Sequence, residues 1–556
     1  MSASSHSEPA VKLTGHGGNH AVEVARRHGV DTVFTLSGGH VFPVYDGAVT
    51  SDPPLRLLDV RHEQTAVFAA EAVGKLTRRA GWAVLTAGPG VTNGVSGVAT
   101  AHFNGSPLVV VGGRAPDSRW GQGLLQELDQ PPLFSTITKR AWTVHDPALI
   151  APALDEAFTL ANTAHRGPVF VDIPMDRLYD QAEVTLEARP AGADRSPDPD
   201  AVAAVARLIG EAQRPVLVYG SDVWLDGAEQ VALEAAEELG IPVVTNGQGR
   251  GVLPAGHPLL ATRARGFALG RADLVVVVGT PLDFRLNHGL FGGRDGAPLA
   301  RTVHITDSPG QLATHLTLAG AVSGDLSLVL RGLAEQAAPR PEVAQWRAEV
   351  AEAAAATAAN DREVLDSDAS PIHPARIYGE LNRVLDDDAV VIGDGGDFVS
   401  YAGKYVEPRR PGNWLDPGPF GCLGTGMGYA IAARLTRPSS QVVALFGDGA
   451  LGFSLSDVDT LVRHNLPVVM VCGNNGIWGL EKAPMQLVYG YDVVADLAPQ
   501  TRYDQVVTAL GGGGELVTDP AEIGPALRRA FDSGVPYLVN IVTDPENVYP
   551  RKTMGV

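Results

Sequence analysis

Two segments in the last quarter of the chain decide the fold: Val442-Val-Ala-Leu-Phe-Gly447-Asp448-Gly449 and Leu466-Pro-Val-Val-Met-Val471-Cys-Gly-Asn474-Asn475. In each segment an apolar run ends in glycine and then in polar residues. Such continuous apolar runs are typical of strands that are buried on both faces of a parallel sheet. Because neighbouring parallel strands end at the same edge of a sheet, we expect Asp448 and Asn475 to lie close together there.

The same pattern occurs along the whole chain, with Ala-rich stretches of helical spacing after the apolar runs. Further predicted strands lie at 81–86, 107–112, 215–220, 274–279 and 389–393. The sequence therefore predicts an α/β fold made of doubly wound parallel sheets. Two Pro-rich stretches, at 187–200 and 337–342, separate three expected domains, and an Ala-rich helix runs from the second stretch to about residue 360. The expected domains span residues 1–186, 190–337 and 365–556.

The composition is that of a large globular protein, and 556 residues suffice for three domains of roughly 100–200 residues each. Acidic residues outnumber basic ones by 63 to 43, which gives a formal net charge of −20. This balance argues against nucleic acid or an anionic membrane as a partner, since both require a basic surface. An anionic small molecule would need a local basic site.

The two cysteines, Cys422 and Cys472, exclude a disulfide framework and favour a reducing compartment. The apolar runs fall far short of the ~20 residues that a membrane-spanning helix needs. The first residues also lack the charged and then apolar pattern of a signal peptide. We therefore expect a cytoplasmic protein.

Asp448 and Asn475 would bring one carboxylate and one amide oxygen to the same edge of the sheet. Hard oxygen ligands of this kind suit Mg²⁺ that holds a diphosphate. Gly447 and Gly449 would let backbone N–H groups approach phosphate oxygens.

This pairing resembles the diphosphate-binding motif of thiamine diphosphate (ThDP) enzymes, and the resemblance covers nearly the whole chain. The segments Arg61-His-Glu63-Gln, Gly88-Pro-Gly90-Val-Thr-Asn93 and Ser106-Pro-Leu-Val-Val-Val-Gly-Gly113 look like the pyrimidine-binding domain of the acetolactate synthase superfamily. Ser37-Gly-Gly-His-Val-Phe-Pro-Val-Tyr45-Asp is similar to the first loop of that domain. The resemblance implies a pyrimidine-binding, a middle and a diphosphate-binding domain, in that order.

The resemblance also implies a role for individual residues. Glu63 would hydrogen-bond N1′ of the aminopyrimidine, and Leu423 would supply the apolar bulk that bends the cofactor. Asp448, Asn475 and the carbonyl of Ile477 would bind Mg²⁺. The remaining expected cofactor contacts are Pro89, Asn93, Gly421, Gly447 and Gly449. Asp397 lies where relatives often place Asn, and its carboxylate would repel phosphate unless it faces away or meets the metal.

The middle domain most resembles 2-hydroxyacyl-CoA lyases and oxalyl-CoA decarboxylases, through the segments 249–258, 264–273 and 279–289. That resemblance implies that Arg265 and Arg409 contact CoA or nucleotide phosphates, with ADP, FAD or CoA in this domain. The fork of a guanidinium suits phosphate because it bonds in a bidentate manner. Leu480 and Arg551 complete the expected substrate contacts, and the tail 547–556 resembles a lid in its position.

Three further residues are candidates for catalysis. Glu481, in Asn475-Gly-Ile-Trp-Gly-Leu-Glu481, is placed as in pyruvate decarboxylase and would protonate a carbanion. Gln126, in Gly123-Leu-Leu-Gln126-Glu, resembles the substrate contact of synthases and lyases. His40 lies in the first loop and is expected to face the pocket.

The hypothesis that combines these features is a ThDP- and Mg²⁺-dependent 2-hydroxyacyl-CoA lyase. It would cleave its substrate reversibly to formyl-CoA and an aldehyde or ketone. Glu481 also favours a 2-oxo acid decarboxylase, whereas Gln126 does not. An oxalyl-CoA decarboxylase is a further alternative. The Gly-Gly first loop favours an acetolactate-synthase-like carboligase, which would ignore CoA, whereas Glu481 does not favour it. A cofactor-binding subunit without turnover would commonly lose Glu63, Asp448 or Asn475, and all three are present.

The resemblance finally implies an assembly. Enzymes of this plan place the pyrimidine-binding and diphosphate-binding domains of different subunits around one cofactor. Glu63 and Asp448 of one site would then come from two chains, so that a homodimer is obligatory and a homotetramer is expected.

Overall fold

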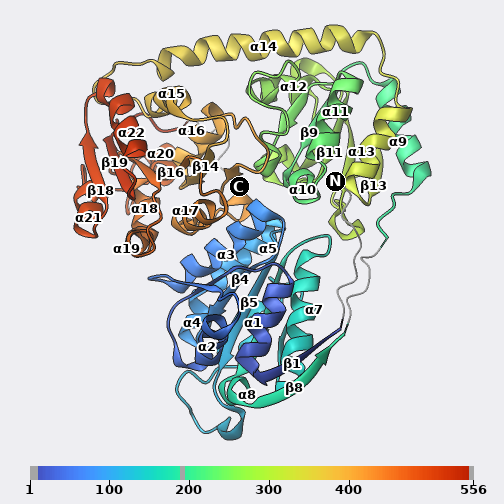
Figure 1. Cartoon of the computed structure of the whole chain (residues 1–556). Helices are drawn as coiled ribbons and strands as arrows, with labels where there is room; N and C mark the ends of the chain where they lie inside the picture. The colour runs from blue at the N-terminus through green and yellow to red at the C-terminus, as the bar shows by residue number, and fades with distance from the viewer. Residues whose placement is uncertain (1–9, 188–193, 550–556) are drawn as a thin grey trace. The chain divides into compact units, whose positions relative to one another are not determined.

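The structure is a computed structural model, and it describes residues 10–187 and 194–549. These residues form two compact units (Figure 1). The first unit contains the described residues up to Asp194, together with 420–436 and 454–466. The second unit contains 195–419, 437–453 and the described residues from Pro467 onward.

The first unit is built on a six-stranded sheet with the order β3-β2-β4-β5-β7-β6, in which each pair of neighbours is parallel. The strands are β2 (Thr32–Thr35), β3 (Arg56–Asp59), β4 (Gly81–Leu85), β5 (Leu108–Arg114), β6 (Ala141–Thr143) and β7 (Pro168–Pro174). β4, β5 and β7 are buried along their whole length. A separate antiparallel pair joins β1 (Val11–His16) to β8 (Gln181–Leu186).

The helices of the first unit follow its strands in the expected alternation. They include α1 (Gly17–Arg27), α2 (Phe42–Thr50), α3 (Glu63–Thr77), α4 (Pro89–Asn93), α5 (Val95–Asn104) and α7 (Ile150–Asn162). A helix from much later in the chain, α17 (Thr425–Thr436), packs against α3. The close approach depends on Gly428, because a Cβ atom there would lie 2.6 Å from Cβ of Phe68.

The second unit holds two parallel sheets. The five-stranded sheet has the order β10-β9-β11-β12-β13 and consists of β9 (Pro215–Tyr219), β10 (Val243–Thr245), β11 (Leu274–Val278), β12 (Arg301–Thr306) and β13 (Gly320–Ser323). The six-stranded sheet has the order β15-β14-β16-β17-β19-β18. Its strands are β14 (Val390–Asp394), β15 (Trp414–Leu415), β16 (Val442–Gly447), β17 (Val469–Asn474), β18 (Gly513–Val517) and β19 (Tyr537–Val542).

Helices flank both sheets of the second unit, as doubly wound sheets require. The five-stranded sheet carries α9 (Pro199–Glu211), α10 (Ser221–Leu225), α11 (Glu229–Leu239), α12 (Arg265–Arg271) and α13 (Leu326–Gln336). The six-stranded sheet carries α15 (Ala375–Val384), α16 (Asp397–Tyr405), α18 (Asp448–Ser454), α20 (Gly479–Tyr489), α21 (Tyr503–Ala509) and α22 (Ile523–Asp532). The long helix α14 (Glu342–Leu365), yellow in Figure 1, leads from one sheet to the other.

The predicted fold class is confirmed, since each of the three large sheets is parallel throughout. β17 differs most in position from its prediction. β17 begins at Val469 rather than at Leu466, because it enters the sheet where Val443 pairs with Val469. Pro467, which has no N–H to donate, remains in the connection before it. Within residues 10–187 and 194–549, no helix is both long enough and apolar enough to cross a membrane.

Candidate active site

Asp448 lies at the C-terminal edge of the six-stranded sheet, where β16 ends and α18 begins. The residue is only 2% exposed. Its Oδ1 accepts a hydrogen bond from the amide of Gly449 at 3.0 Å, and its Oδ2 accepts one from the amide of Gly476 at 2.7 Å. Because Gly476 follows β17, the carboxylate links the ends of two adjacent strands. The structure thus brings Asp448 and the Asn475 segment to one edge.

The two asparagines after β17 have different surroundings. Asn474 is buried, and its Nδ2 donates to the carbonyl of Thr501 at 2.9 Å and to Oδ1 of Asn540 at 3.0 Å. These bonds fix Asn474 within the sheet and its loops. The Oδ1 atom of Asn475 accepts a bond from the amide of Ile477 at 3.2 Å. Asn475 therefore remains the candidate ligand of the pair.

The residues at this edge fit a divalent cation that holds a diphosphate. Burial raises the pKa of Asp448 to about 6, although the amides of Gly476 and Gly449 lower it. A cation beside such a buried carboxylate would favour its charged form. Asn475 can add an amide oxygen and Ile477 a backbone carbonyl, and Mg²⁺ prefers oxygen ligands of both kinds.

Asp397 begins α16, directly after the strand β14. Its Oδ1 accepts a hydrogen bond from the amide of Tyr549 at 2.7 Å, and Asp397 is 7% exposed. The Oη atom of Tyr401, on the same helix, donates to the carbonyl of Asn547 at 3.1 Å. Asp397 thus faces the end of the described chain. The rest of the predicted lid, with Arg551, lies outside the described residues.

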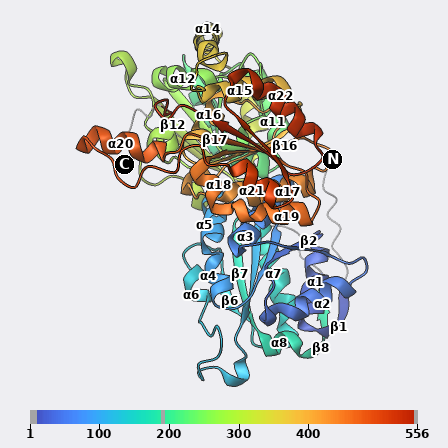
Figure 2. The ribbon, with the colours of Figure 1, turned by 90° about the vertical axis from the view of Figure 1, so that its left-hand side faces the viewer.

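Glu481 and Leu480 lie in the first turn of α20, which projects from the second unit (Figure 2). Glu481 is exposed. Leu480 is half-buried and approaches the loop after β14 closely, since a Cβ atom on Gly396 would lie 2.5 Å from its Cδ1. The last turn of α20 exposes Leu487, Val488 and Tyr489. The helix therefore presents an apolar end to solvent.

Glu63 is the first residue of α3 in the first unit and is buried. Its Oε2 accepts a hydrogen bond from Nδ2 of Asn93, at the end of α4, at 2.9 Å. Pro89 begins α4 and is exposed, and a Cβ atom on the following Gly90 would lie 3.5 Å from Oε1 of Glu63. The three predicted residues Glu63, Pro89 and Asn93 thus form one group.

His40 and Gln126 lie at a neighbouring part of the same sheet edge. His40 Nδ1 is 3.2 Å from Oγ1 of Thr86, and burial lowers the pKa of His40. The backbone of Gln126 adopts a φ of 62° beside Gly88, where a Cβ atom would lie 3.1 Å from the Cα of Gln126. Gln130 fixes this loop, because its Oε1 accepts a bond from the amide of Gly88 at 2.8 Å.

Gly421 and Leu423 precede α17, within the part of the chain that belongs to the first unit. Gly421 is exposed, with a φ of 68°, and Leu423 is half-buried. The carbonyl of Leu423 lies 3.5 Å from Nε2 of Gln64, the residue after Glu63. The structure thus places Leu423 near the start of α3.

The five-stranded sheet carries a cluster of arginines. Burial, together with the charges of Arg250 and Arg285, lowers the pKa of Arg265 to about 10. An Nη atom of Arg265 donates to the carbonyl of Arg285 at 2.6 Å. Arg409 is exposed and forms an ion pair with Asp387. Arg409 already has an acidic partner, whereas an anion at Arg265 would offset the repulsion between its charge and those of Arg250 and Arg285.

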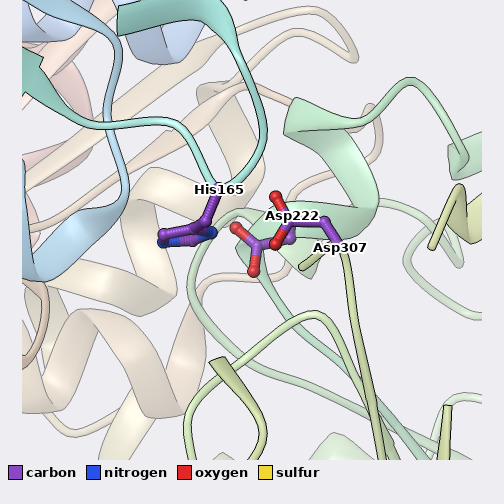
Figure 3. A group of neighbouring side chains, drawn as sticks. All are labelled: His165, Asp222 and Asp307. Carbon is purple, nitrogen blue, oxygen red and sulfur yellow. The ribbon is translucent and has the colours of Figure 1, made fainter. Parts of the chain in front are cut away.

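Two buried carboxylates lie at the C-terminal edge of this sheet, Asp222 on α10 and Asp307 after β12 (Figure 3). Their nearest oxygens are within 4.8 Å of each other. His165, also drawn in Figure 3, belongs to the first unit. A pair of carboxylates accepts hydrogen bonds from hydroxyl or amide groups and repels phosphate.

Comparison with known proteins shows the family. Residues 15–133 match the N-terminal TPP binding domain of thiamine pyrophosphate enzymes, residues 202–333 match the central domain, and residues 394–541 match the C-terminal TPP binding domain. The chain belongs to the thiamine pyrophosphate enzyme family. It is therefore a ThDP-dependent enzyme, and the Glu63 and Asp448 groups lie in its two TPP binding domains.

Relatives of this ThDP enzyme carry two different names. The acetolactate synthase large subunit IlvG of Mycobacterium tuberculosis is 48% identical over 551 residues, which cover 98% of this chain and 99% of the relative. The 2-hydroxyacyl-CoA lyase 2 of Danio rerio is 33% identical over a match that covers 96% of this chain and 92% of the relative. The human 2-hydroxyacyl-CoA lyase 2 is also 33% identical, with 95% and 90% covered. The alternative of an acetolactate-synthase-like enzyme therefore has stronger support than the lyase hypothesis.

Sequence reasoning missed several polar groups of this ThDP enzyme. Gln130 holds the Gly88 loop, and Asp457 accepts hydrogen bonds from Arg61 and Thr65, which precede and follow Glu63 by two residues. Gln130 lies only four residues after Gln126, so its position beside a predicted site residue could have identified it. Asp457 stands almost 400 residues from Glu63, and its local sequence, Ser454-Leu-Ser-Asp457, contains no motif.

Proposed function

We propose that this ThDP enzyme is a carboligase of 2-oxo acids of the acetolactate synthase type. One 2-oxo acid would lose CO₂, and its remaining acyl carbon would add to the carbonyl carbon of a second 2-oxo acid. The observation that carries this proposal is the 48% identity with an acetolactate synthase over 98% of the chain. That identity spans both TPP binding domains and the central domain.

The chain's own residues have separate tasks in this proposal. Glu63 binds a ring nitrogen of the cofactor, and Asn93 orients the Glu63 carboxylate through the 2.9 Å bond from its Nδ2. Asp448, Asn475 and the carbonyl of Ile477 would hold Mg²⁺, and the amide of Gly447 would be available to the diphosphate. The amide of Gly449 orients Asp448 instead. When it is bound, ThDP supplies the electron sink for the carbanion that decarboxylation leaves.

Other predicted residues would act on the substrate. Gln126 and His40 lie on loops at the same sheet edge as Glu63, where each can offer a polar contact. Leu480 supplies an apolar surface near the loop after β14. Glu481 is exposed in the first turn of α20. It would contact a substrate only if another protein surface covered this turn. Gly421 and Leu423 would contact the cofactor ring.

A 2-hydroxyacyl-CoA lyase is the second candidate, and the half-buried cluster of Arg250, Arg265 and Arg285 favours it. Three guanidinium groups together would gain from the phosphates of CoA or of ADP, because an anion offsets their mutual repulsion. The enzyme would then break the C1–C2 bond of the thioester and release formyl-CoA with an aldehyde or ketone. Relatives that bear this name are 33–34% identical.

We also propose that the active enzyme is an assembly of at least two chains, with a homotetramer as the expected form. Glu63 of one chain and Asp448 of another would hold the same cofactor. The support for this is the family resemblance, together with the apolar end of α20 that one chain exposes to solvent.

A turnover assay with ThDP and Mg²⁺ tests the proposed function. Pyruvate and 2-oxobutyrate would be offered beside a short panel of 2-hydroxyacyl-CoAs and oxalyl-CoA, and products would be identified by mass. We expect 2-hydroxy-3-oxo acids from the oxo acids, with release of CO₂. Formyl-CoA from the hydroxyacyl thioesters, with no product from the oxo acids, would contradict the proposal and favour the lyase.

A further inference from the structure

A carboxylate outside the predicted cofactor residues accepts hydrogen bonds from residues before and after Glu63 in the sequence. Asp457 ends η10 (Leu455–Asp457), in the segment 454–466 of the first unit. The residue is completely buried, at 0% exposure. A buried carboxylate is costly unless its oxygens are hydrogen-bonded, so the bonds that it accepts must be specific.

The bonds to Asp457 come from both sides of Glu63. Its Oδ1 accepts a hydrogen bond from the amide of Arg61 at 2.7 Å, and its Oδ2 accepts one from Oγ1 of Thr65 at 2.7 Å. Arg61 precedes Glu63 by two residues, and Thr65 follows it by two. A third bond, from Oγ1 of Thr460 at 2.8 Å, fixes Oδ1 from the side of α19 (Val458–Arg463).

These bonds fix the backbone at the start of α3, which determines where the Glu63 side chain points. α3 begins at Glu63, and its own cap is weak: Nδ1 of His62 accepts from the amide of Gln64 at 3.2 Å. A negative charge near the N-terminus of a helix is stabilised by the helix dipole and by the free N–H groups there. Asp457 brings a carboxyl group to this turn from a distant part of the sequence, and it bonds the amide of Arg61 and the hydroxyl of Thr65.

The segment that carries Asp457 is itself fastened to the strand before α3. Arg463 donates from one Nη atom to both carboxylate oxygens of Asp59, at 3.0 and 2.8 Å. Nε2 of His464 lies 3.0 Å from Oδ1 of Asp59, the last residue of β3. The connection from β3 to α3 is therefore held at its start by Arg463 and at its end by Asp457.

We propose that Asp457 is a positioning residue for Glu63, which it holds in line with the cofactor by fixing the residues two before and two after it. The proposal rests on the role of Glu63 in the proposed function. Asp457 does not touch the cofactor, and it acts only through α3. Small displacements of a catalytic group reduce rates strongly, so loosening this turn should slow activation of the cofactor.

The test compares two isosteric changes at the same carboxylate, Thr65→Val and Thr460→Val, in the full-length enzyme loaded with ThDP and Mg²⁺. Each removes one hydroxyl donor to Asp457, but only Thr65 lies on α3. The readout is the rate at which the C2 proton of bound ThDP exchanges for deuterium, measured by NMR after an acid quench. Thermal unfolding of both variants measures the purely structural cost.

We expect Thr65→Val to slow the exchange about tenfold or more. Thr460→Val should stay within about threefold of the wild type, at a similar loss of thermal stability. Thr65→Ser, which keeps the hydroxyl, should restore the wild-type rate. Equal exchange rates in Thr65→Val and Thr460→Val would overturn the proposal. Asp457→Asn should slow the exchange further, and if it fails to fold, the threonine pair still decides.

Two more measurements separate this proposal from the function on which it rests. Glu63→Gln should abolish the exchange, and a wild-type rate in that variant would refute the role of Glu63 and the proposal together. If Glu63→Gln abolishes the exchange while Thr65→Val does not slow it, only the role of Asp457 fails. In the cofactor-free protein, amide exchange at residues 61–66 should be faster in Thr65→Val than in Thr460→Val, and equal protection would also contradict the proposal.

Discussion

Two buried carboxylates dominate the chemistry at the scale of residues, and their surroundings assign them different tasks. Asp448 accepts bonds from the amides of Gly449 and Gly476, and burial raises its pKa to about 6. Glu63 accepts a bond from the side chain of Asn93. A carboxylate held by amides at a sheet edge suits a metal ion, whereas one held by a side-chain amide is free to bind a ring nitrogen through its other oxygen.

Asn93 provides a prediction at this scale. Asn93→Ala removes the donor to Oε2 of Glu63, and a hydrogen bond to a charged group contributes about 1.5–3 kcal/mol. We therefore expect kcat to fall by roughly tenfold to a hundredfold, as measured by steady-state kinetics with pyruvate. Thr92→Ala, a change at the neighbouring exposed residue, is the control and should leave kcat unchanged. A wild-type kcat for Asn93→Ala would remove Asn93 from the site.

Several of these residues could be predicted from the sequence, for a physical reason. Asp448 and Asn475 follow strands whose apolar runs are unmistakable, and parallel strands deliver their ends to one edge. Asp457 is different, because its partners Arg61 and Thr65 are distant in sequence and nothing in its local pattern marks it. Arg409 had the residue type of a phosphate contact, but its sequence context did not reveal the nearby Asp387.

At the scale of elements, the packing of α17 on α3 rests on a buried polar group as well as on the small Gly428. Oε2 of Glu71, on α3, accepts a bond from Oη of Tyr429, on α17, at 2.8 Å. Its Oε1 accepts bonds from Asn104 Nδ2 at 2.9 Å and Ser106 Oγ at 3.1 Å. This network joins α3, which carries Glu63, to the helix that follows Leu423.

Glu71 makes the contribution of this helix pair to folding stability depend on pH. Burial raises the pKa of Glu71, although Lys75, Asn104, Tyr429 and Ser106 lower it. Because the pKa is higher in the folded state, the stabilising contribution of this carboxyl is complete below its ordinary value of 4.5 and is lost as pH rises through the folded value. We expect the unfolding temperature of the wild type, relative to that of Glu71→Gln, to fall as pH rises above 4.5.

The control for this prediction is Glu342→Gln, the same change at an exposed position in the first turn of α14. Its unfolding temperature should follow that of the wild type at every pH. A difference between wild type and Glu71→Gln that stays constant from pH 4.5 to 8, or that changes in the opposite direction, would contradict the assignment of the shift to burial.

The sequence predicted strands such as β4, β11 and β16 because buried parallel strands are continuous apolar runs. The start of β17 was predicted three residues too early, because Leu466 and Val468 continue the apolar run without belonging to the ladder. The docking of 420–436 and 454–466 on the first unit could not be predicted, since it depends on the match between the surfaces of distant helices.

At the scale of the whole molecule, the predicted assembly leads to a complementation experiment. If Glu63 and Asp448 of one site come from two chains, Glu63→Gln and Asp448→Asn homomers should each be inactive. After the two variants are unfolded together and refolded, or co-expressed, mixed dimers would contain one site with both residues intact. We expect up to about a quarter of the wild-type activity from an equal mixture, on the statistics of random pairing.

The measurement for this experiment is turnover of pyruvate by the mixture, compared with each variant treated alone. A mixture of Glu63→Gln with a variant of the same domain, Asn93→Asp, is the control and should show no more activity than Asn93→Asp alone. Inactive mixtures of Glu63→Gln and Asp448→Asn, in which co-purification of two differently tagged chains shows that mixed dimers form, would indicate that each chain builds its site alone.

The most direct test of the central claim, a ThDP-dependent carboligase of 2-oxo acids, is ¹³C NMR of the purified enzyme turning over pyruvate labelled at C1 and C2. With ThDP and Mg²⁺ present, we predict release of half of the labelled C1 as CO₂ and a new bond between two labelled C2 atoms, seen as carbon–carbon coupling in the product. Both signals should vanish without ThDP and in Glu63→Gln. Release of all labelled C1 with formation of acetaldehyde, or unchanged pyruvate beside rapid cleavage of a 2-hydroxyacyl-CoA, would contradict the claim.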